Sequence, residues 1–118
     1  MNSDDTLRSL PASNVILHYW NILVVDLPGE DVQEIFIGYS AEHKLGRVST
    51  PIEYFDINTG QGKTRSGSKY QTVGAPGVPH DFAIYTLEQL IGTAMVNKEL
   101  FSDSKNSGKI SFKYPAEQ

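Results

Sequence analysis

The stretch from Gly46 to Gly77 constrains the fold of this chain more than any other part of it. Short runs rich in β-branched and aromatic residues alternate there with Gly, Asn and Ser at the spacing of tight turns. Because Pro51 cannot donate to a sheet ladder, we expect its strand to lie at an edge or to carry a bulge there. The pattern predicts a strand, a loop and a tight hairpin, over residues 47–56, 57–62 and 63–73.

Two further strands are predicted before this unit. Residues 14–26 are apolar at most positions, and residues 32–40 alternate between two faces. A turn with Pro and Gly over residues 27–31 joins them into a hairpin. Since the first strand is apolar on both faces, we expect it either to be covered on both sides or to lie against another subunit. Residues 1–13 are polar, which predicts an extended or frayed lead-in.

The apolar period changes from that of a strand to that of a helix in the last third of the chain. The favoured N-cap is Asp81, while Thr86 with Gln89 forms a competing capping box that would begin the helix later. Gly92 weakens the middle of this helix, which we expect to end near Leu100. The predicted apolar stripe consists of Phe82, Ile84, Leu87, Leu90, Ile91, Ala94 and Met95.

The order of elements predicts an α+β fold in a single domain over residues 1–118. After a loop over 102–108, the apolar residues Ile110, Phe112 and Tyr114 alternate with polar ones in a short last strand. We expect an antiparallel β-sheet of five to six strands, a meander of hairpins, packed on one helix in the C-terminal half. One helix covers only part of such a sheet, and a homodimer is the simplest way to bury the rest.

Composition limits the kinds of site that the chain can hold. It has no cysteine, hence neither a disulfide nor a thiolate metal site. Its histidines, His18, His43 and His80, lack metal-ligand spacing, and we expect no cofactor. The acidic N-terminus does not resemble a signal peptide, and the longest apolar run is too short to span a bilayer. We therefore expect a cytoplasmic protein.

The formal charge of −4 is unevenly distributed. Residues 1–42 carry seven acidic side chains and one basic one, a net charge of −6. Between residues 44 and 69 the balance reverses to five basic side chains and two acidic ones. This pattern suits an anionic partner or a self-complementary dimer, although a solvated hairpin surface also produces it. The predicted basic face consists of Lys44, Arg47, Lys63, Arg65 and Lys69.

The sequence contains no complete catalytic motif. The segment Gly60–Thr64 ends in Gly-Lys-Thr but lacks the first glycine and the following helix of a phosphate-binding loop. His80 and Asp81 are the best acid–base pair, yet a helix N-cap gives the same residues. We therefore lean against an enzyme. The candidate ligand-binding residues are His80, Asp81, Trp20, Tyr39 and Tyr70.

Residues Gly38 to Gly77, about a third of the chain, carry a further pattern. It reads GYS, then GRVSTPI, then FD, then TRSG, then Tyr70, then GAPG. In this pattern the chain resembles a family of small uncharacterised bacterial proteins of mobile DNA, of the integron gene-cassette and prophage type. The resemblance implies a cytoplasmic bacterial accessory protein. It implies no established activity and supplies no catalytic residues.

Taken together, these features favour a non-enzymatic, homo-oligomeric binding module. Its ligand, a small molecule or a protein, would lie in a groove between the sheet, the connection 75–81 and the start of the helix. One alternative is a protein antagonist of the immunity type that acts through the acidic N-terminal third. Another is a weak nucleic-acid binder on the basic face, which we favour less because an excess of three positive charges is small. An enzyme around His80 and Asp81 is the least supported hypothesis.

Overall fold

The computed structural model describes residues 14–101 and 109–114. The predicted lead-in over 1–13 and loop over 102–108 lie outside these residues. Each predicted strand is present within about two residues of its predicted bounds. The elements are β1 (Asn14–Val25), β2 (Gln33–Ser40), β3 (Leu45–Asp56), β4 (Gln61–Thr64), β5 (Lys69–Thr72), α2 (Asp81–Ile91), α3 (Thr93–Val96), the π-helical turn η1 (Asn97–Phe101) and β6 (Ile110–Phe112).

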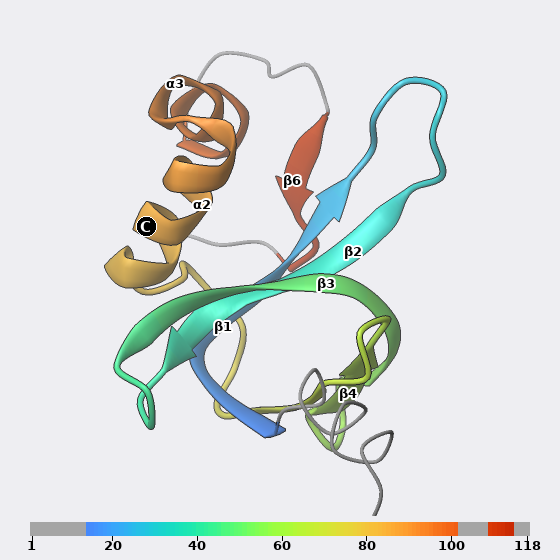
Figure 1. The fold of residues 1–118 in the computed structure, drawn as a ribbon, viewed down its shortest axis with the longest axis vertical. Helices are drawn as coiled ribbons and strands as arrows, with labels where there is room; N and C mark the ends of the chain where they lie inside the picture. The colour runs from blue at the N-terminus through green and yellow to red at the C-terminus, as the bar shows by residue number, and fades with distance from the viewer. Residues whose placement is uncertain (1–13, 102–108, 115–118) are drawn as a thin grey trace, which may run out of the picture.

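Five strands close into a barrel, where the sequence had predicted an open meander (Figure 1). Strands β1 to β5 pair in chain order, and each of these pairings is antiparallel. β5 then pairs in parallel with the first half of β1, from Asn14 opposite Lys69 to Leu17 opposite Thr72. This last pairing closes the barrel and removes the free edges that an open sheet would expose. β6 adds to the second half of β1, antiparallel to it.

A bulge divides β1 into two halves that pair with different strands. Its register against β2 shifts between His18 and Asn21, and Tyr19 within the shift has a φ of 44°. A bulky residue at positive φ is an outlier that costs on the order of 1–3 kcal/mol. The residues before the bulge pair with β5, and those after it pair with β2 and β6.

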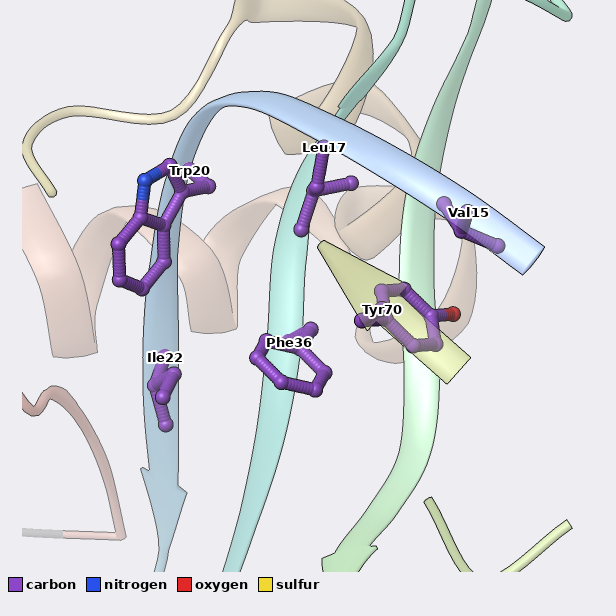
Figure 2. Close-up of a cluster of buried hydrophobic side chains, with 6 residues drawn as sticks. All are labelled: Val15, Leu17, Trp20, Ile22, Phe36 and Tyr70. Carbon is purple, nitrogen blue, oxygen red and sulfur yellow. The ribbon is translucent and has the colours of Figure 1, made fainter. Parts of the chain in front are cut away.

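One buried apolar cluster fills the barrel (Figure 2). The rings of Phe36 and Tyr70 stack with centroids 4.6 Å apart, and Trp20 meets Phe55 edge to face at 5.5 Å. A Cβ atom at Gly62 would lie 2.7 Å from the Phe36 ring, so only glycine fits there. The buried members of the cluster are Val15, Leu17, Trp20, Ile22, Phe36 and Tyr70.

A second apolar cluster lies between the barrel and the helices. The sequence left open what covers the two faces of β1: one face lines the barrel, while on the other Leu23 packs on this helical layer and Ile16 is half exposed. Gly46 of β3 passes the first turn of α2 so closely that a Cβ atom there would overlap the Phe82 carbonyl. The buried members of this cluster are Leu23, Ile37, Ala83, Leu87 and Val96.

Pro51 lies beside a bulge and not at an edge. β3 pairs with β2 on one side and with β4 on the other, and its register against β2 shifts next to Pro51. The Ser49 hydroxyl accepts a hydrogen bond of 2.8 Å from the Phe36 backbone N–H within this shift. A side chain therefore supplies the acceptor that a regular ladder would take from the backbone.

The predicted helix is divided, and its cap lies one residue earlier than predicted. α2 begins at Asp81, and its cap is His80, whose Nδ1 accepts a hydrogen bond of 3.0 Å from the Phe82 N–H. The alternative start at Thr86 is wrong. Gly92 ends α2 with a φ of 96°, after which α3 and η1 continue the layer close to the predicted end.

The apolar stripe of the helix is only partly buried. Leu87 is buried as predicted, and Ala83 is buried although it was not part of the stripe, while Phe82, Leu90 and Ile91 are exposed. A short helix on the convex outside of a barrel makes contact along a narrow line, which explains why fewer positions are covered than on a flat sheet. Closure of the barrel buries the inner face of the sheet but leaves part of the outer face exposed, and the dimer stays a prediction. No helix in the described ranges is long and apolar enough to cross a membrane.

Candidate functional site

The structure separates the five predicted ligand-binding residues. Trp20 and Tyr70 are 1% and 4% exposed inside the barrel, and the Trp20 indole Nε1 donates to a carbonyl of the β5–α2 connection at 3.0 Å. Both are core residues. Tyr39 and His80 meet at the start of α2, where their rings stack with centroids 4.3 Å apart, and the exposed Asp81 follows. The five residues therefore do not line one groove.

Four rings gather at the start of α2. The ring centroids of Tyr19 and Phe82 lie 5.9 Å and 4.9 Å from that of His80, which also stacks on Tyr39. The His80 Nδ1 is occupied by the helix cap, and the His80 backbone N–H bonds to the Tyr19 carbonyl. These contacts give His80 a structural role. The hollows described below are lined by residues other than these four rings.

A hollow of about 540 Å³ lies on the outer wall of the barrel. Tyr54 of β3 stands opposite Lys63 of β4 in the sheet register, Lys63 stands opposite Lys69 of β5, and Lys69 stands opposite Asn14 of β1. Residues directly opposite each other project from the same face of a sheet. These four outward-facing side chains therefore form one line across four strands, about 14 Å long at the usual strand spacing. We name this line the Tyr54 row.

A second line of side chains runs beside the Tyr54 row in the same hollow. Gln61 of β4 is opposite Gln71 of β5, which is opposite Ile16 of β1. The Gln71 amide donates to the Thr59 carbonyl at 2.9 Å, while the Gln61 side chain makes no hydrogen bond with any described residue. Ile16 is half exposed. The hollow thus offers an amide and an aliphatic surface beside the ring and the two ammonium groups.

Lys63 and Lys69 face each other, and no carboxylate of the described residues forms an ion pair with either. Like charges directly opposite on neighbouring strands are destabilising. The one ion pair found among residues 14–101 and 109–114 joins Lys113 to Glu34 at 2.8 Å. There the hydrogen bond to the carboxylate raises the pKa of the Lys113 ammonium. Two lysines without a partner in the described part of the chain produce a positive local potential that favours an anion.

The five residues of the predicted basic face do not form one surface but lie at separate positions in the structure. Lys63 and Lys69 come together in the Tyr54 row. Arg65 lines another hollow that also contains two acidic side chains. Lys44 lies in the β2–β3 turn with a φ of 55°, and Arg47 lies at one end of the barrel. The predicted basic face therefore contained both lysines of the row, but the candidate ligand-binding residues did not include Tyr54 or Asn14, because only the strand register places these two beside the lysines.

The described residues contain no cluster of three or more His, Asp or Glu side chains suited to a metal ion. Comparison with protein-family models, with curated proteins and with solved structures finds no match to this chain. The resemblance to bacterial proteins of mobile DNA therefore stays a prediction, and the function has to be argued from the geometry.

Proposed function

We propose that the protein is a non-enzymatic binding module for a small anionic compound that contains a planar ring. The observation that carries this proposal is the pair Lys63 and Lys69, which no described carboxylate neutralises, beside the exposed Tyr54 over the hollow on the barrel wall. The proposal keeps the small-molecule binding module predicted from the sequence. It moves the site from the helix start to the barrel wall.

Tyr54 supplies a surface for the ring of the ligand. Its side chain is 57% exposed, although aromatic side chains are costly to leave in water. Stacking of a planar base on an aromatic side chain contributes about 1–3 kcal/mol. A planar ring is therefore the part of the ligand that Tyr54 favours.

Lys63 and Lys69 supply the attraction for the negative charge. A single exposed ion pair contributes only about 0.2–1 kcal/mol. Here one anion would pair with two ammonium groups and would also relieve the repulsion between them. The unbonded Gln61 amide beside them is placed to hydrogen-bond polar atoms of the ligand.

The size of the site favours a small molecule over a long polyanion. A volume of about 540 Å³ falls within the usual range for small-molecule sites. A nucleic-acid strand would be attracted by the same ring and lysines, but the whole chain carries a charge of −4. The experiment therefore has to distinguish a small-molecule ligand from a nucleic-acid strand.

Calorimetric titration with adenosine monophosphate, adenosine and inorganic phosphate separates the ring from the charge. We expect the nucleotide to bind more tightly than either part alone. Tyr54→Ala should weaken the nucleotide and adenosine, and Lys63→Gln with Lys69→Gln should weaken the nucleotide and phosphate. Lys44→Gln removes a lysine outside the row and serves as the control.

Two results would contradict the proposal. Equal loss of nucleotide binding in Lys44→Gln would mean that net charge, and not the row, attracts the ligand. Absence of binding for the nucleotide and for a panel of aromatic carboxylates would remove the proposal altogether. A steep rise of affinity with the length of a single-stranded oligonucleotide would instead assign the row to nucleic acid.

The acidic tip of the β1–β2 hairpin favours a second candidate function, that of a protein antagonist. Asp26, Glu30 and Asp31 lie at or beside this turn, which Figure 1 shows projecting away from the barrel. An exposed acidic tip is suited to a basic partner. Capture of one specific partner from a bacterial lysate at low salt, lost when these acids are replaced by amides, would support this function. Capture unaffected by the replacement would contradict it.

A further inference from the structure

Arg47 lies at one end of the barrel, apart from the Tyr54 row. It pairs with Gly38, where a Cβ atom would point into the barrel against Leu17. Because directly opposite residues share a face, Arg47 also projects from the inner face of β3. Its side chain is half-buried, and its Nε donates to the Tyr70 hydroxyl at 3.3 Å.

The Arg47 guanidinium has unused hydrogen-bonding capacity. No carboxylate of residues 14–101 or 109–114 forms an ion pair with it, and its terminal nitrogens make no hydrogen bond with a described residue. A guanidinium carries five N–H donors and keeps its charge at any physiological pH. Partial burial of an unpaired charge is unfavourable, and a bound anion would offset that penalty.

A hollow of about 350 Å³ lies beside this guanidinium. Its lining contains the hydroxyl groups of Thr50 from β3 and Ser66 from the β4–β5 loop. The Thr50 hydroxyl donates to the Ser66 oxygen at 3.1 Å, and the Thr64 hydroxyl lies 3.1 Å from the same oxygen. No acidic side chain is among the described residues of the lining. The hollow therefore combines one positive charge with two neighbouring hydroxyl groups.

We propose that this hollow binds a phosphate group, through the Arg47 guanidinium and the hydroxyls of Thr50 and Ser66. A carboxylate has two oxygens in one plane, which the guanidinium fork alone can satisfy. A tetrahedral phosphate has further oxygens, which the rotatable hydroxyls can reach once they release their bonds to each other. The volume exceeds that of a phosphate ion and leaves room for the organic part of a phosphate monoester.

The experiment has to distinguish two possible ligands that carry the phosphate group: inorganic phosphate and a phosphate monoester. Titration of the ¹⁵N-labelled protein with inorganic phosphate, glycerol phosphate and acetate does so, because none of these probes has a ring for Tyr54. We expect glycerol phosphate to shift the amide signals of residues 47–50 and 64–68, with at least fivefold higher affinity than acetate. Equal affinity for inorganic phosphate and the ester would assign the pocket to the free ion.

Variants test which groups carry the binding. Arg47→Lys keeps the charge but loses the fork, and we expect about a tenfold loss of phosphate affinity, the equivalent of about 1.4 kcal/mol. Ser66→Ala and Thr50→Val are exposed positions that leave the barrel core intact, and each should weaken binding a few fold. Lys63→Gln with Lys69→Gln should weaken phosphate at the Tyr54 row but leave unchanged the affinity measured from the signals of residues 47–50, so the two sites are tested independently.

The proposal is overturned if acetate binds as tightly as glycerol phosphate, or if neither phosphate probe shifts the named signals. It is also overturned if phosphate binding survives in Arg47→Lys, Ser66→Ala and Thr50→Val alike. Should Arg47→Lys fail to fold, the two hydroxyl variants decide the question alone.

Discussion

His80 caps α2 with a ring nitrogen, a role that Ser, Thr, Asp and Asn usually fill. The Tyr39 ring stacks on the imidazole at 4.3 Å and fixes its orientation, so that Nδ1 points at the Phe82 N–H. A residue with a poor intrinsic preference for the position thus caps the helix because its neighbours hold it there. Asp81, the cap favoured from the sequence, lies in the first turn and is exposed.

Replacement of His80 tests this assignment. His80→Ala should destabilise the protein by about 1 kcal/mol through loss of the cap, with up to about 1 kcal/mol more from the lost ring contact. Asp81→Ala loses only a favourable charge in the first turn and should cost about 0.3–1 kcal/mol. Urea unfolding of both variants measures the difference. A larger loss in Asp81→Ala would mean that Asp81 is the cap.

Gly62 offers a second test at the level of one residue. A Cβ atom there would press on the Phe36 ring at 2.7 Å and on the Tyr54 carbonyl at 2.9 Å. Gly62→Ala should therefore destabilise the barrel by roughly 1–3 kcal/mol. Gly77→Ala is the matched control, since a Cβ atom there would meet nothing within 4 Å. Equal unfolding midpoints for the two variants would contradict the packing described for the barrel interior.

The β4–β5 hairpin shows why an element can be predicted more easily than its register. Gly67, with a φ of 91°, and the serines around it made a tight turn predictable from the sequence. A two-residue turn centred on Ser66 and Gly67 would place Lys63 opposite Tyr70. The observed register places Lys63 opposite Lys69 instead, with Thr64 bonded to Ser68 across a three-residue loop, and this single-residue difference creates the lysine pair.

Charge reversal in this hairpin should move stability and binding in opposite directions. Lys69→Glu turns a repulsive cross-strand pair into an attractive one, and should stabilise the protein by roughly 0.2–1 kcal/mol. The same change removes the positive potential and should abolish binding of adenosine monophosphate. Chemical unfolding and calorimetry on one sample measure both effects. Lys44→Glu should change neither, and a destabilised Lys69→Glu variant that still binds would refute the account of the row.

The closure of the barrel could not be predicted from local pattern. Each hairpin is joined by a short turn whose residues can be read in the sequence, such as the Pro and Gly of 27–31. The parallel pairing of β5 with β1 joins residues 69–72 to residues 14–17, across more than fifty residues. No tight turn connects these two strands, so no turn residues in the sequence indicate that they pair. The alternation of burial along β1 is also reset by the bulge at Tyr19, which no residue type there predicts.

At the scale of the whole molecule, α2 carries one group of exposed apolar side chains, in addition to others such as Ile16 and Tyr54 on the barrel wall. Phe82, Tyr85 and Leu90 are each more than half exposed along this helix. The sequence located the excess of apolar surface on the sheet, and one face of that sheet lines the barrel interior. The homodimer stays a prediction, and we expect α2 to supply its interface.

Light scattering at low and high salt tests whether the protein forms a dimer through α2. If α2 pairs with α2 of a second copy, the mass should be twice 13.1 kDa at both salt concentrations, since apolar contacts are little screened. Leu90→Lys with Tyr85→Lys should then give the monomer with an unchanged unfolding midpoint. A wild-type monomer would remove the prediction of a dimer.

The central claim of this account is that the ligand binds on the barrel wall and not at the helix start. The most direct test is a ¹⁵N–¹H correlation spectrum recorded during titration with adenosine monophosphate. The account predicts that the largest shifts fall on Asn14, Tyr54, Lys63 and Lys69, the four members of the Tyr54 row. Shifts centred on Tyr39 and His80, with the row unmoved, would contradict it.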